Sequence, residues 1–162
     1  MTVVLVTGMS GTGKSTVLAE LERRGHRVVE TDEGAWTETV PDPDRGEDRI
    51  WREDRIEALL DGHAEGTLFI AGCVPNQGRF YPRFHAVVLL SAPLGVVLER
   101  IASRRTNDYG KTDAERALIV EDVTTVEPLL RTGATAEIDT RLPVAEVADR
   151  LESIAGAAAP VE

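Results

Sequence analysis

Residues 8–15 read Gly-Met-Ser-Gly-Thr-Gly-Lys-Ser, and Thr16 follows them directly. The stretch matches G-x-x-x-x-G-K-[ST] at every position, a pattern typical of loops that cradle the phosphates of a nucleoside triphosphate. Its glycines let backbone N–H groups turn toward phosphate oxygens without Cβ clashes. The Lys14 side chain would reach the β- and γ-phosphates, and the Ser15 hydroxyl would bind Mg²⁺. The expected nucleotide-binding residues are Gly8, Ser10, Gly11, Thr12, Gly13, Lys14, Ser15 and Thr16.

The sequence on both sides of this loop predicts alternating buried strands and amphipathic helices. Short apolar runs predict strands over 2–7, 27–30, 67–71, 86–90 and 136–139. Helices are expected over 14–24, 47–60, 93–104, 113–130 and from 143 to about 154, with turns over 33–48 and loops over 73–84 and 105–112. Such alternation favours an α/β fold with a parallel sheet covered on both faces, and ligands bind beyond the carboxyl ends of such strands.

Composition limits the classes of protein that this chain can represent. Its 162 residues predict a single domain over 1–154, followed by a flexible tail over 155–162. The lone Cys73 excludes an intrachain disulfide, and the longest apolar runs, about six residues, are too short to cross a bilayer. The N-terminus lacks the features of a signal peptide, so a cytoplasmic location is expected. A net charge of −10 disfavours nucleic acid or an anionic membrane as partner. The expected partner is a small-molecule substrate, and the chain is expected to be a monomer or homodimer.

The chain resembles the small P-loop kinases related to adenylate kinase, shikimate kinase and gluconate kinase. The resemblance rests on the phosphate loop, on Glu30-Thr31-Asp32, on the arginine-rich segment 100–105 and on Asp139-Thr140 before a proline-opened helix. It implies a three-layer P-loop NTPase fold with a five-stranded parallel sheet in the order 2-3-1-4-5. It also implies ATP with Mg²⁺ as phosphoryl donor, an acceptor-binding insert over about 33–66 and a small lid over about 104–113.

Glu30 and Asp32 stand two residues apart at a predicted strand end and point the same way. The related kinases carry a D-x-D here, which implies that Ser15, Glu30 and Asp32 surround the metal and that Asp32 also engages the acceptor hydroxyl. A hydroxyl nucleophile benefits from a carboxylate that takes its proton, whereas a phosphate nucleophile needs arginines. Two alternatives stay open: residues 31–34 can be a rearranged S/T-x-G-D turn of the adenylate-kinase type, or the two acids are simply solvated.

Several side chains are candidates for the acceptor site. Trp36 can stack on a ring or fill the core, and Arg52 can face an anionic acceptor or lie on a salt-bridged solvent face. Asn76 and Gln77 can donate hydrogen bonds to acceptor hydroxyls or stabilise a turn. The expected acceptor-binding residues are Asp32, Trp36, Arg52, Asn76, Gln77, Arg79 and Lys111.

Arginines gather where the fourth helix runs into the predicted lid. Arg100, Arg104 and Arg105 can stabilise the charge that develops on the transferred phosphoryl group, or they can complement the helix dipole. The resemblance implies that Arg104 or Arg105 also stacks on adenine, and that the loop holding Arg141 cradles this base. Lys111 lies in a glycine-containing loop that can close over the phosphates.

These observations favour a kinase that moves the γ-phosphoryl group of ATP to a hydroxyl of a small polar metabolite. Lys14, Asp32, Arg100, Arg104 and Arg105 are the expected catalytic residues. A nucleoside or nucleoside monophosphate kinase is the first alternative, and it requires acceptor-facing arginines within 45–83. A non-catalytic NTP-binding switch protein is the second.

Overall fold

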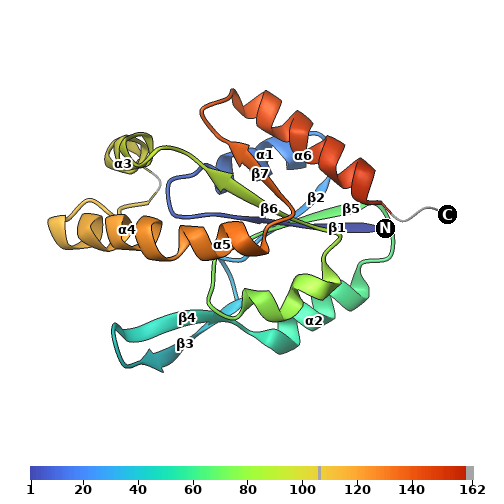
Figure 1. The fold of residues 1–162 in the computed structure, drawn as a ribbon. Helices are drawn as coiled ribbons and strands as arrows, with labels where there is room; N and C mark the ends of the chain where they lie inside the picture. Colours follow the sequence, from blue (N-terminus) through green and yellow to red (C-terminus); the bar gives the residue numbers. More distant parts are fainter. Residues whose placement is uncertain (106, 160–162) are drawn as a thin grey trace.

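A five-stranded parallel sheet forms the centre of the molecule (Figure 1). The computed structural model describes residues 1–105 and 107–159. The strands are β1 (Thr2–Thr7), β2 (Arg27–Glu30), β5 (Thr67–Ala71), β6 (Ala86–Ser91) and β7 (Ala136–Asp139). They lie in the order β2-β5-β1-β6-β7, and every neighbouring pair is parallel. Counted among themselves these strands have the order 2-3-1-4-5, so the expected α/β fold is confirmed.

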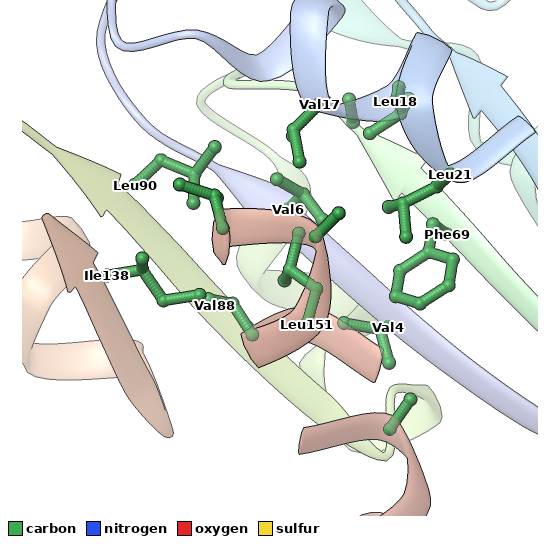
Figure 2. Close-up of a cluster of buried hydrophobic side chains, with 14 of the residues drawn as sticks. Val4, Val6, Val17, Leu18, Leu21, Phe69, Val88, Leu90, Ile138 and Leu151 are labelled. Carbon is green, nitrogen blue, oxygen red and sulfur yellow. The ribbon is translucent and has the colours of Figure 1, made fainter. Parts of the chain in front are cut away.

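Helices cover both faces of the sheet. On one face α1 (Lys14–Arg23) and α6 (Val144–Ala158) pack over the strands. Figure 2 shows Leu21 of α1 and Leu151 of α6 converging on Val4 and Val6 of β1. Because successive side chains of a strand point to opposite faces, Val3 and Leu5 instead join the cluster with α2 (Glu53–Gly62) and the 3-10 helix η1 (Gln77–Arg83).

Three helices lie toward the carboxyl-terminal side of the sheet, and the last of them packs against β6 (Figure 1). They are α3 (Leu94–Ser103), α4 (Asp113–Thr125) and α5 (Glu127–Gly133). The single helix expected over 113–130 is divided at Val126, because Pro128 in the first turn of α5 favours a new helix start there. Between α3 and α4 the chain forms the loop that was expected as a lid, and Thr106 within it lies outside the described residues.

The segment before α2 corrects the sequence prediction. Residues 37–51, expected as turns and the first part of a helix, form an antiparallel hairpin of β3 (Thr37–Asp42) and β4 (Gly46–Trp51). Its turn is stabilised by Asp42 Oδ1, which accepts hydrogen bonds of 2.8 Å from the backbone N atoms of Asp44 and Arg45. The helical spacing therefore holds only from Glu53 onward.

Two further boundaries differ from the expected ones. The expected loop 73–84 contains η1. Helix α6 continues to Ala158, so residues 155–158 belong to this helix and Ala155 is buried in the core. Residues 160–162 of the expected tail lie outside the described residues. No helix within residues 1–105 and 107–159 has the length and apolar character needed to cross a membrane.

Candidate active site

The phosphate loop connects the end of β1 to the start of α1. Gly8 and Gly11 adopt positive φ values of 151° and 81°. A Cβ on Gly8 would lie 2.5 Å from Leu90 O, and one on Gly11 would lie 2.8 Å from the Ile101 side chain. Glycine is therefore required at both positions, and the backbone is free to wrap around an anion. Behind the loop Thr12 is buried and its hydroxyl donates to Met9 O at 2.8 Å.

Lys14 lies inside this loop. Its ammonium donates to Gly8 O at 2.6 Å and to Met9 O at 3.0 Å. Burial lowers the pKa of Lys14, and Cys73 and Asp32 oppose that shift. A polyphosphate in the loop would add counter-charge to this half-buried cation, so Lys14 is placed to bind phosphate oxygens.

The metal-side candidates meet at the mouth of the loop. The Ser15 hydroxyl donates to Glu30 Oε1, which brings the end of β2 to the first turn of α1. Asp32 lines the same pocket as Ser15. A hydroxyl with carboxylate oxygens is the donor set that Mg²⁺ prefers. Among the described residues no three His, Cys, Asp or Glu side chains form a group that could hold a metal ion.

A pocket of about 740 Å³ opens from the phosphate loop toward α3 and the start of α6. It brings together eleven of the predicted site residues. These are Gly8, Ser10, Gly11, Gly13, Lys14, Ser15, Thr16, Asp32, Arg100, Arg104 and Arg141. Its far wall is apolar and consists of Leu142, Pro143, Val144 and Val147. Charged groups at one end and an apolar wall at the other match the phosphates and the base of a nucleotide.

Arg100 lines this pocket, and its guanidinium is hydrogen-bonded within the protein. Its guanidinium donates to Thr140 Oγ1 at 2.9 Å and to Thr140 O at 2.6 Å. It therefore fixes the segment after β7 against α3. Arg141 lines the pocket edge, and its guanidinium forms an ion pair of 2.6 Å with Asp139.

Arg104 joins the loop between α3 and α4 to the phosphate loop. It donates to Tyr109 O at 2.6 Å, to Asn107 O at 3.1 Å and to Ser10 Oγ at 3.4 Å. Burial lowers the pKa of its guanidinium. Arg105 is exposed and is not part of the pocket lining. Lys111 donates from its ammonium to Arg104 O, so it points to the end of α3 in this arrangement.

Of the residues expected to bind the acceptor, some lie near the phosphate loop and others do not. Trp36 is half-buried and lines a second hollow of about 490 Å³ together with Ser15, Glu30 and Glu33. Because Ser15 lines both hollows, the second one adjoins the phosphate loop.

The remaining acceptor-side candidates bind other parts of the protein. Arg52 lies 3.5 Å from Asp54, and Arg79 forms an ion pair of 2.8 Å with Glu53. Asn76 and Gln77 use their amides within the protein and are absent from the residues that line either hollow. These four side chains are not brought to the phosphate loop.

Sequence reasoning did not name Cys73 and Asn107 as site residues, and both line the pocket. Burial raises the pKa of the Cys73 thiol. The loop that holds Arg141 was expected to cradle the base, and Thr140, Leu142 and Pro143 of this loop line the pocket.

Comparison with known proteins gives a family and a fold. A family model described as an AAA domain, AAA_18, matches residues 4–121. HPr kinase/phosphorylase of Bacillus mycoides (strain KBAB4) is 41% identical over 83 residues, which cover 47% of this chain and 25% of that protein. HPr kinase/phosphorylase of Bacillus anthracis (strain A0248) matches with the same figures. The matched region thus spans about a quarter of the length of these curated relatives.

Solved structures are similar over nearly the whole chain. Shikimate kinase from Acinetobacter baumannii in complex with shikimate has a TM-score of 0.65 at 19% identity, with 95% of this chain and 92% of that chain covered. A sugar kinase from Janibacter sp. HTCC2649 has a TM-score of 0.59 at 19% identity, with 99% of both chains covered. At these identities the likeness shows the fold, which is that of the P-loop small-molecule kinases.

Proposed function

The chain belongs to the AAA_18 family of AAA domains, and from this membership and the pocket geometry we propose that it is an ATP-dependent phosphotransferase. It would move the γ-phosphoryl group to a hydroxyl of a small polar molecule. The observation that carries the proposal is a single pocket that holds Lys14, Ser15 and Asp32 together. This combination would provide a phosphate ligand, a metal ligand and a carboxylate, and the adjoining second hollow, lined by Trp36, would take the acceptor.

The proposed reaction assigns a separate task to each residue. Lys14 binds oxygens of the β- and γ-phosphates, and Arg104 covers the pocket from the lid side. Asp32 accepts the hydroxyl proton as the acceptor oxygen bonds to the γ-phosphorus, and the bond from that phosphorus to the β,γ-bridging oxygen breaks to release ADP. Ser15 and Glu30 would hold Mg²⁺, which neutralises phosphate charge when bound.

The structure favours a hydroxyl acceptor over a nucleoside monophosphate. A phosphate acceptor would need guanidinium groups directed at it from 45–83. Four of the six arginines there instead face carboxylates: Arg45 with Asp122, Arg52 with Asp54, Arg79 with Glu53 and Arg83 with Asp61. The second hollow is lined by Glu22, Glu30 and Glu33, which would repel an anionic acceptor.

A second candidate acceptor follows from the sequence match. The relatives that are 41% identical over 83 residues are named for HPr, so HPr itself is a candidate for this chain. The match spans a quarter of those proteins, and HPr therefore belongs in any acceptor screen.

The test measures ADP release with ATP·Mg²⁺ and a panel of acceptors. The panel contains sugars, polyols, nucleosides, nucleotides, aminoglycosides and HPr. The proposal predicts turnover with a hydroxyl compound. Asp32→Asn is expected to lower kcat by about 10²–10⁴-fold while ATP binds with nearly unchanged affinity.

The matched control for Asp32→Asn is Asp61→Asn. Asp61 is an exposed carboxylate at the far end of α2 that pairs with Arg83, so its replacement should leave kcat unchanged. Turnover by Asp32→Asn at the wild-type rate would refute the proton-accepting role. Turnover with nucleoside monophosphates alone would refute the choice of acceptor.

A further inference from the structure

The hairpin of β3 and β4 has its own means of attachment to the core. Among the residues that the structure describes, it forms a separate two-stranded sheet and pairs with no strand of the five-stranded sheet. Its position relative to the phosphate loop therefore depends on contacts outside the two sheets, which include the ion pair of Arg45 with Asp122 at its tip and a set of contacts at its base. Trp51, the last residue of β4, is fully buried on the α2 face of the sheet. Next to Trp51, Arg52 N donates to Trp36 O at 2.7 Å, which joins the two ends of the hairpin.

Asn76 holds this base through two hydrogen bonds. Trp51 N donates to Asn76 Oδ1 at 2.9 Å, and Asn76 Nδ2 donates to Trp51 O at 3.0 Å. The side-chain amide thus binds both backbone groups of one residue, as a neighbouring strand would. A side chain from the loop that follows β5 thus holds the base of the hairpin, while Arg45 and Asp122 pair at its tip.

Gln77 turns in the other direction and binds the strand that leads to the phosphate loop. Its Nε2 donates to Thr7 Oγ1 at 3.0 Å and to the Tyr81 hydroxyl at 2.9 Å, and its Oε1 accepts from Val74 N at 2.9 Å. Gln77 and Thr7 are both buried. Thr7 is the last residue of β1, and the phosphate loop begins at the next residue.

The buried indole of Trp51 adds a contact beside the proposed proton acceptor. Trp51 Nε1 donates to Thr31 Oγ1 at 2.9 Å, and this hydroxyl donates to Ala71 O at 2.7 Å. Thr31 directly precedes Asp32. The base of the hairpin, the end of β2 and the loop after β5 are therefore joined by hydrogen bonds at the carboxyl edge of the sheet.

We propose that Asn76 and Gln77 are positioning residues for phosphoryl transfer. They form a bracket in which one amide fixes the hairpin and the next fixes the phosphate-loop strand. The inference rests on the proposed function, because the hairpin base at Trp36 borders the hollow assigned to the acceptor. The bracket sets the distance between the acceptor hydroxyl and the γ-phosphorus, and a displacement of about 1 Å there can cost roughly 100-fold in rate.

The first part of the test measures the bracket without any acceptor. Hydrogen–deuterium exchange is compared for the wild type, Asn76→Ala and a control, Thr132→Ala. Asn76→Ala removes two side-chain hydrogen bonds, whereas Thr132→Ala removes one at an exposed position of α5. Asn76→Ala is expected to raise exchange over 37–51 and to leave exchange over 2–16 unchanged. Unchanged exchange over 37–51 would overturn the bracket. Asn76→Ser serves if the alanine variant does not fold.

The second part measures catalysis with ATP·Mg²⁺ and the acceptor that the panel identifies. Asn76→Ala is expected to lower kcat by roughly 10–100-fold, while the KM for ATP stays within about twofold, since Asn76 binds the hairpin. A purely structural role would instead change both constants together with thermal stability. Wild-type kcat in Asn76→Ala, despite faster exchange of the hairpin, would overturn the positioning role. A wild-type protein that phosphorylates no acceptor would overturn the kinase proposal itself, so the two failures are distinguishable.

Discussion

Replacing Gly72 with alanine tests the packing at the carboxyl edge of the sheet. A Cβ at Gly72 would lie 2.4 Å from Thr31 Oγ1 and 3.1 Å from the Trp51 ring. The Thr31 hydroxyl cannot move away freely, because it donates to Ala71 O and accepts from Trp51 Nε1. Overpacking of this kind costs about 1–3 kcal/mol, and a broken hydrogen bond adds about 1 kcal/mol. We expect Gly72→Ala to lower the free energy of unfolding by about 2–4 kcal/mol.

Urea unfolding measures this loss, and calorimetry should show a fall in Tm of roughly 5–15 °C. The decisive comparison is a double-mutant cycle with Thr31→Ala, which removes the hydroxyl that the new methyl group would meet. In that background Gly72→Ala should cost less than about 1 kcal/mol. Gly156→Ala is the control, because nothing lies within 4 Å of its Cβ position in α6, and it should stabilise by up to about 1 kcal/mol. An equal cost of Gly72→Ala in both backgrounds would refute the reasoning.

Two further predictions concern charged groups. Hydrogen bonds from Arg23 and Arg24 lower the pKa of Glu20 from 4.5 to about 2. The stabilisation from Glu20 is therefore complete above pH 4.5 and is lost as the pH falls toward 2. In acid titrations followed by circular dichroism, Glu20→Gln should flatten the decline of stability over that pH range. An unchanged slope would contradict this prediction. Arg104→Ala removes the hydrogen bonds to Asn107 O and Tyr109 O. It should speed hydrogen exchange over 107–112 and weaken ATP·Mg²⁺ binding about tenfold, whereas Arg105→Ala should change neither. Equal effects of the two variants would contradict the assigned role of Arg104.

The phosphate loop could be predicted from the sequence because its requirements are local. Gly8 and Gly11 are required by their own φ values and by atoms that would meet a Cβ. The strand–loop–helix order around them follows from short apolar runs and helical spacing. The resemblance led us to expect Asp32 next to this loop, and Asp32 and the loop do line the same pocket.

The hairpin could not be predicted with the same rules. Ile50 and Trp51 fall at helical spacing with Ile56, Leu59 and Leu60, so the pattern favoured one continuous helix. In the structure Trp51 is buried as the end of a strand, and only the last three belong to α2. Spacing alone does not distinguish a strand end from a helix start when the apolar residues lie close together.

The functions of the polar side chains in 72–84 depended on distant partners. Asn76 binds Trp51, 25 residues away, and Gln77 binds Thr7, 70 residues away. Their sequence neighbourhood allowed either an acceptor-binding role or a structural one. Contacts with residues far away in the sequence determine that both side chains have a structural role, and no local sequence pattern indicates such contacts.

Isothermal titration of the protein with ATP·Mg²⁺ tests the central claim most directly. The account predicts saturable binding to one site, and strong weakening by Lys14→Ala, because Lys14 is the half-buried cation inside the loop. Absence of heat and of any saturable uptake by the folded wild-type protein would contradict it.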